Sequence, residues 1–178
     1  MQAIGELRND HELILATLSR FEAALTAAER EGAFDPATFA AYLAFFRDFA
    51  GRCHHAKEEQ ALFPALIAAG LPARGGPIAC MLDEHEQGRA RLAAMAEAID
   101  SGALAALADQ GRDYVDLLRD HIAKENGVLF MMAEQLLDEV AAQRLAAAFT
   151  GLGGALLEQA EAARQACARL ATQGSGMT

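Results

Sequence analysis

The sequence predicts an all-α protein, an up-down four-helix bundle with an additional C-terminal helix. Hydrophobic residues make up 53% of the 178 residues, there is no Trp and there are only 4 Pro. Ala and Leu are frequent and β-branched residues few, a mix that favours helices over sheet. Apolar residues recur at helical spacing along most of the chain. A segment at 54–64 is echoed at 121–131, which indicates two copies of one helical hairpin.

The first two helices follow from their ends and their apolar faces. The first is expected from about Ile4 to Glu31, where Gly32 ends it, and His11 falls within its apolar stripe. The second is expected from about Pro36 to Ala69. Pro64 should kink this second helix about one turn earlier, because proline removes one backbone hydrogen bond.

The third and fourth helices repeat this layout. The third is expected from Pro77 to about Asp100 and carries His85 on its apolar stripe. The fourth carries His121 and Glu125 on its apolar face, and Gly111 is expected to make its first turns irregular. The four helices together define a predicted domain at 1–137.

A fifth helix is expected at 138–172. Asp138 or a neighbour should cap it, and it should reach to about Thr172. It contains no histidine, so we expect it to pack on the bundle or at a subunit interface, where it would support a homodimer. Residues 173–178 are expected to form a disordered tail.

The echo places a histidine and a glutamate four residues apart in each segment. HHAKEEQALFP at 54–64 and HIAKENGVLFM at 121–131 share their first, third, fourth and fifth residues and the later Leu-Phe. On a helix, His54 and Glu58 lie on one face, as do His121 and Glu125. A weaker echo, NDHE at 9–12 and DEHE at 83–86, adds one histidine from each remaining helix.

Four imidazoles and two carboxylates would thus face the interior. Left unpaired, each would cost roughly a few kcal/mol, whereas metal ions would satisfy all of them. Six ligands exceed the need of one tetrahedral ion, so we predict two ions bridged by the glutamates. Nitrogen and oxygen ligands without thiolate suit iron or manganese, with zinc as a substitute. The predicted metal ligands are His11, His54, Glu58, His85, His121 and Glu125.

Charge and cysteine content narrow the partners. The formal net charge is −10, which disfavours nucleic acid and anionic lipid as partners. The start of the chain lacks a signal-like apolar core, and no segment reaches 18 uninterrupted apolar residues. Cys53, Cys80 and Cys167 form no CxxC motif and are interpreted as reduced thiols of a cytoplasmic protein. Cys53 and Cys80 are expected to be buried.

At this point the sequence resembles the hemerythrin family in its bacterial HHE form, over about residues 1–137. The resemblance implies a non-haem di-iron centre, bridged by the two carboxylates and a solvent oxygen, that binds O₂, NO or peroxide. It rests on His11, HHxxEExxLFP at 54–64, Glu84-His85 with Gly88-Arg89, and His121-x-x-x-Glu125 followed by Leu129-Phe130.

One departure from the family bears on function. Its oxygen carriers have a second histidine one turn after the helix-three ligand, where this chain has Arg89. The loss argues against reversible oxygen transport and allows redox chemistry. The expected function is therefore a di-iron protein that binds or senses small oxidants. The alternatives are an enzyme that reduces peroxide or NO, an iron donor for the repair of iron centres, and a non-redox structural or iron-signalling role.

The roles of a rival ligand pair, His55 and Glu59, and of Tyr114 remain open. His55 and Glu59 have the same spacing, but their counterparts in the echo are Ile122 and Asn126, which cannot repeat the chemistry. His55 is therefore expected to support the site or lie at the surface, although a family variant with an extra ligand there is conceivable. Tyr114 is expected either to donate a hydrogen bond near the site, to gate access to it or simply to pack.

Overall fold

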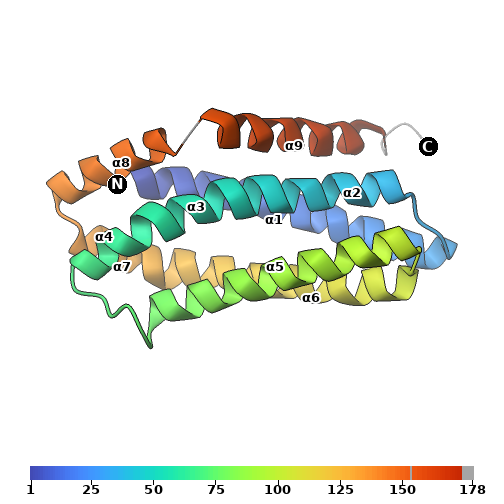
Figure 1. Cartoon of the computed structure of the whole chain (residues 1–178), viewed down its shortest axis with the longest axis horizontal. Helices are drawn as coiled ribbons and strands as arrows, with labels where there is room; N and C mark the ends of the chain where they lie inside the picture. Colours follow the sequence, from blue (N-terminus) through green and yellow to red (C-terminus); the bar gives the residue numbers. More distant parts are fainter. Residues whose placement is uncertain (153, 174–178) are drawn as a thin grey trace.

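The computed structural model describes residues 1–152 and 154–173, and all regular elements within them are helical. The predicted all-α class is confirmed. Figure 1 shows the long helical segments of residues 2–136 lying side by side, with the C-terminal helices along one side of them. Within the described part of the chain, no helix is both long enough and apolar enough to cross a bilayer.

Of the four long segments, the first and third are α-helical throughout, and the second and fourth also contain π-helical stretches. The first is α1 (Gln2–Glu31), and the third is α5 (Pro77–Ser101). The second runs continuously through α2 (Pro36–Ala44), η1 (Phe45–His54), α3 (His55–Lys57), η2 (Glu58–Leu62) and α4 (Phe63–Ala68). The fourth runs through α6 (Leu104–Lys124), η3 (Glu125–Leu129) and α7 (Phe130–Leu136). The stretches labelled η are π-helical, with a wider turn than an α-helix.

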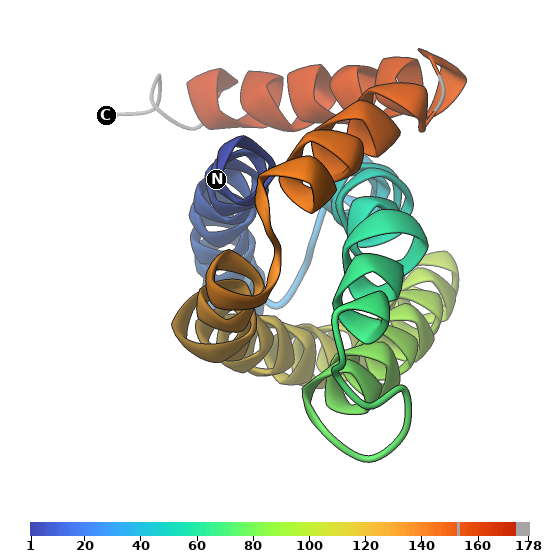
Figure 2. The ribbon, with the colours of Figure 1, turned by 90° about the vertical axis from the view of Figure 1, so that its left-hand side faces the viewer.

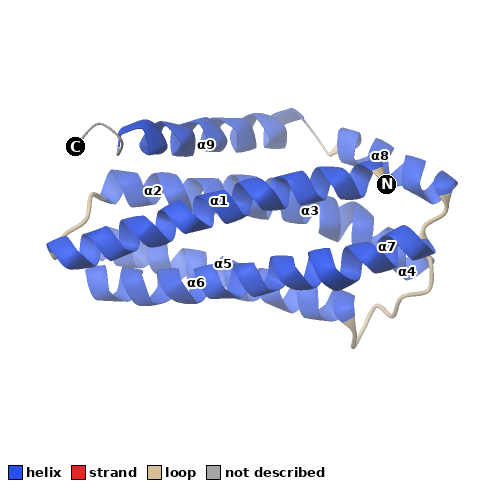
Figure 3. Ribbon diagram, turned by 180° about the vertical axis from the view of Figure 1, so that it is seen from behind, coloured by secondary structure: helices blue, strands red, loops and turns tan. Residues whose placement is uncertain are grey.

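Local sequence signals set the ends of these segments close to where they were expected. Gly32 ends α1 with φ 68°, and Gly102 ends α5 with φ 68°; glycine takes this left-handed conformation at little cost. Asp35 caps α2 by accepting from the Ala37 and Thr38 backbone N–H groups. The long connection between α4 and α5 is the loop at the lower right of Figure 3.

Two local irregularities were expected within the helices, one before Pro64 and one at Gly111. The kink expected one turn before Pro64 stays a prediction; the structure has the π-helical stretch η2 at that position, and the helix continues through it into α4. The irregular start expected at Gly111 is wrong: this residue lies inside the continuous helix α6. A Cβ there would lie 2.6 Å from Leu25 Cδ1, so the glycine serves the close approach of α1 to α6.

The C-terminal region consists of two helices instead of the single one expected. Asp138 caps α8 (Glu139–Gly151), with its side chain accepting from the Ala141 N–H at 2.8 Å. The chain then forms α9 (Gly154–Gln173), and the glycines at this junction disfavour a continuous helix. α8 packs on α1 and η2, while α9 packs against α2 and η1 and runs across the long segments, which Figure 2 shows nearly end-on. Of the tail expected at 173–178, residue 173 ends α9 and 174–178 lie outside the described residues.

The apolar core is divided into two clusters. One is built around Phe21, Phe46 and Tyr114, and the other around Leu62 and Phe130. Along the first three long segments the predicted ligands fall between the residues of the two clusters; on the fourth, Glu125 does so and His121 lies one residue before Ile122, the last member of the first cluster on that segment. The polar side chains are therefore held at one level between two water-excluding layers. Tyr114 packs in the first cluster, with its ring centroid 5.1 Å from that of Phe46, as its packing alternative expects.

Candidate metal centre

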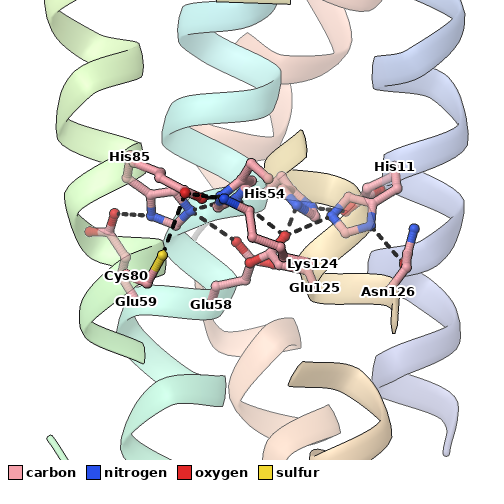
Figure 4. Close-up of polar contacts among 12 residues, drawn as sticks. His11, His54, Glu58, Glu59, Cys80, His85, Lys124, Glu125 and Asn126 are labelled. Carbon is pink, nitrogen blue, oxygen red and sulfur yellow. Dashed lines mark hydrogen bonds and ion pairs between the residues drawn. The ribbon is translucent and has the colours of Figure 1, made fainter. Parts of the chain in front are cut away.

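The six predicted ligands converge in the interior at one level of the four long segments. Figure 4 shows that the ligands labelled there point toward one another from different helices. His121 lies at the same level, since its Nε2 is 3.1 Å from His85 Nε2 and 3.2 Å from Glu125 Oε2. The four histidines each expose 1% of their surface and the two glutamates 0%. Such complete burial of six polar groups is unusual for structural residues. They are His11 on α1, His54 and Glu58 on the second segment, His85 on α5, and His121 and Glu125 on the fourth.

The ligand atoms form two groups of four, and each group is compact enough to surround a cation. Within each group these atoms all lie within 4.8 Å of one another. Glu58 belongs to both groups. The first group is His11, His54, Glu58 and Glu125, and the second is His55, Glu58, His85 and His121.

The two glutamates lie where they would join the groups. Glu58 Oε1 is 3.4 Å from His54 Nε2, and Glu58 Oε2 is 3.5 Å from His85 Nε2. Glu125 Oε2 is 3.2 Å from both His11 Nε2 and His121 Nε2. Each carboxylate thus faces one histidine of each group and could contribute to binding a cation in either of them.

Several of these atoms have no hydrogen-bond partner among the described residues. They are the Nε2 atoms of His11 and His54 and all four carboxylate oxygens of Glu58 and Glu125. A buried polar atom without a partner costs about 1–3 kcal/mol. A bound cation would satisfy these unmet lone pairs together, so the residues present fit a metal.

The contact between His85 and His121 supports the same reading. Their Nε2 atoms face each other at 3.1 Å. His85 Nδ1 lies 2.7 Å from Glu59 Oε1, and His121 Nδ1 lies 3.0 Å from Glu84 Oε2. If both Nδ1 atoms donate to these carboxylates, two neutral rings present opposed lone pairs, which a cation beside them would stabilise.

The same outer support holds all four predicted histidine ligands. His11 Nδ1 lies 3.0 Å from Asn126 Oδ1, and His54 Nδ1 lies 3.4 Å from Asp10 Oδ2. An oxygen acceptor at Nδ1 fixes the ring and leaves Nε2 free to bind a metal. All four Nε2 atoms therefore face the interior as potential ligands.

This outer layer follows the sequence repeat, although the sequence analysis did not identify it. Asp10 and Glu84 each directly precede a predicted histidine ligand, within the NDHE and DEHE segments. Lys57 Nζ lies 2.9 Å from Asp10 Oδ2, and Lys124 pairs with Glu84 in the same way. The sequence contained one signal for this outer layer: the two HxxKE motifs share a lysine, Lys57 and Lys124, that is not itself a predicted metal ligand.

Burial and mutual contact shift the ionisation of these groups. Burial lowers the pKa of His54 to about 4 and also lowers that of His85. Burial, together with the nearby Glu125, raises the pKa of Glu58. Although burial acts to raise it, the pKa of Glu125 is lowered by its contacts with His11 and His121. Neutral imidazoles are the form that binds metal, and a bound cation would displace the Glu58 proton.

His55 is not at the surface, so that part of the sequence interpretation is wrong. It exposes 6% of its surface, and its ring stacks on that of His85 with centroids 3.7 Å apart. Glu59, its rival partner, instead lies against His85 and Arg89, whose Nη1 is 3.1 Å away. The expected burial of Cys80 is also wrong, because this residue is exposed on α5. Cys53 is buried as expected.

The all-helical fold and this buried histidine–glutamate centre define a cation-binding helical protein. A scan of family models matches residues 2–133 to the hemerythrin HHE cation binding domain. The chain belongs to this family, as the sequence resemblance indicated. Searches of curated proteins and of solved structures returned no match.

Proposed function

We propose that the protein binds two non-haem iron ions within an up-down four-helix bundle and uses them to bind or sense a small oxidant, namely O₂, NO or peroxide. The observation that carries this proposal is the pair of ligand groups that share Glu58 and contain buried atoms without hydrogen-bond partners. Six side chains would hold the metals: His11, His54, Glu58, His85, His121 and Glu125.

The donor set supports iron over most other metals. Neither ligand group contains a cysteine, and mixed imidazole and carboxylate ligation suits iron, with manganese or zinc as substitutes. Bound iron would supply redox electrons and open coordination positions for a small ligand. The chain's own part is to hold the imidazoles in place through the outer acceptors and to exclude water with the two apolar clusters.

Reconstitution tests the proposal directly. Metal-free protein is incubated anaerobically with ferrous iron, desalted and assayed for metal, and two irons per chain are expected. His54→Ala and Glu58→Ala should each abolish this stoichiometry. Glu12→Ala is the matched control, because Glu12 is exposed beside a predicted ligand. Two irons retained by both ligand variants would refute the site.

An enzymatic role is the second candidate, and Arg89 favours it. Arg89 pairs with Glu59 at 3.1 Å and with Glu86 at 3.0 Å, so it adds no ligand to the centre. Optical spectra recorded on adding O₂, NO or peroxide to the iron-loaded protein separate the roles. A stable, reversible change indicates binding, and consumption of peroxide or NO indicates an enzyme. Transfer of iron to an acceptor chelator would indicate an iron donor.

We also propose a homodimer that uses the C-terminal helices. α8 and α9 lie along one side of the four long segments, where a second chain would have access to them. Sedimentation of the full-length protein tests the assembly, and a monomer at all concentrations would contradict it.

A further inference from the structure

We infer that His55 is a seventh metal ligand and that it makes the two metal positions unequal, with the position at His55, His85 and His121 binding its ion more tightly. The inference rests on the proposed function, because it concerns the same centre. It adds a residue that the sequence repeat excluded and predicts the order in which the two positions fill.

The burial of His55 is otherwise unexplained. Its Nδ1 atom is buried and has no hydrogen-bond partner within the described chain. The Nδ1 atoms of the other four histidines each face an oxygen acceptor. A residue kept only for packing would avoid this cost, since an apolar ring of similar size needs no partner.

The position of His55 supplies the reason. It offers a ligand atom within 4.8 Å of those of Glu58, His85 and His121. π-Helical stretches lie on both sides of it, η1 ending at His54 and η2 beginning at Glu58. A wider turn reduces the angle between consecutive side chains, so two adjacent histidines both reach the interior. Such local widening of a helix is frequent at functional sites.

The other half of the repeat has no equivalent. Ile122 stands where His55 would be repeated, and it is buried in an apolar cluster. The first group therefore has two histidines and the second has three. The outer layer adds to the difference, because His85 is backed by the carboxylate of Glu59 and His11 by the amide of Asn126. A carboxylate makes the supported imidazole the stronger metal ligand.

Titration of metal-free protein with ferrous iron, against a competing chelator under anaerobic conditions, tests this assignment. The full-length protein is expected to bind two irons with clearly different affinities. His55→Leu should weaken the tighter step by at least about 10- to 100-fold, the range seen when even a supporting group is removed. The weaker step should change little. Ile122→Leu, the matched change in the other half, should leave both steps unchanged.

The outcomes separate the two proposals. If the wild-type protein binds no iron, the proposed function fails. If it binds two irons and His55→Leu binds them with unchanged affinities, only the role of His55 fails. Two equal affinities in the wild-type protein would overturn the inferred asymmetry.

A second measurement keeps the inference testable if His55→Leu does not fold. The chain contains 5 histidines, and all of them would be ligands. In zinc-loaded protein labelled with ¹⁵N-histidine, one ring nitrogen of every histidine should show the chemical-shift change of metal coordination. Four coordinated histidines and one unchanged ring, assigned to His55, would overturn the inference.

Discussion

Replacing Asp10 by Asn is expected to destabilise the metal-free protein more than the matching replacement of Glu84 by Gln. Both carboxylates support a histidine and pair with a lysine, but the two lysines differ in exposure. The Lys57 side chain exposes 7% of its surface and that of Lys124 exposes 44%. Losing one partner of a buried pair costs about 3–5 kcal/mol, whereas an exposed pair contributes about 0–1 kcal/mol.

The structure narrows the expected difference in the free energy of unfolding between the two variants. Lys57 keeps a second partner, since its Nζ is 2.7 Å from Glu6 Oε1, but the Glu6 side chain is 47% exposed. We therefore expect Asp10→Asn to cost about 2–3 kcal/mol and Glu84→Gln at most about 1 kcal/mol. Urea unfolding of chelator-treated protein, followed by circular dichroism, measures both. Equal losses, or a larger loss for Glu84→Gln, would refute the reasoning.

The same pair predicts a pH dependence. Burial acts to raise the pKa of Asp10, but His54 and Lys57 lower it below its ordinary value of 3.8. A carboxylate with a lowered pKa contributes its full stability above the unfolded value and loses it as the pH falls through the folded value. The difference between wild type and Asp10→Asn should therefore be complete at pH 7 and shrink only below about pH 4. A difference that shrinks already between pH 7 and 5 would contradict this assignment.

Three further outcomes are expected. Gly111→Ala should lower the free energy of unfolding by about 1 kcal/mol, because crowding against Leu25 outweighs the gain in helix propensity; a stabilised variant would contradict this packing. Iodoacetamide should modify the exposed Cys80 before the buried Cys53 and Cys167, and peptide mass spectrometry checks this order. The rate of modification of Cys80 should still increase above pH 9, because partial burial and the nearby Glu84 carboxylate raise the pKa of its thiol. Removing bound metal should lower Tm by several degrees, since metal at 1,000 times its Kd stabilises by about 4 kcal/mol; equal calorimetric Tm values would argue against a metal in the core.

The convergence of the six predicted ligands could be predicted because it depends on spacing within helices. His54 and Glu58 are four residues apart, so any helix through them places both on one face. The repeat then carried the same argument to His121 and Glu125, and Gly32 and Asp35 marked where helices end and begin. The structure brings these side chains together, and their binding of metal remains the prediction that reconstitution tests.

What the sequence did not reveal depends on local winding and on contacts between helices. His55 was set aside because its counterpart in the repeat is Ile122, and the apolar pattern carries no sign of a π-helical turn that would bring both His54 and His55 to the interior. The outer acceptors, such as Asn126 beside His11, are neighbours only after the helices have packed. The C-terminal region forms two helices, α8 and α9. Its apolar spacing is helical throughout, so the spacing did not reveal that the glycines between them would divide the helix.

Lys57 connects the predicted metal centre to the C-terminal region. Its ammonium lies 2.9 Å from Asp10, which supports His54, and 5.9 Å from the centroid of the Phe149 ring on α8. A change at either end alters the surroundings of the same charge. By thermodynamic reciprocity, if metal occupancy alters how firmly α8 is seated, then contacts made by α8 alter metal affinity equally. α8, which packs on α1 and η2, is thus placed to report on, and to adjust, a centre buried in the middle of the protein.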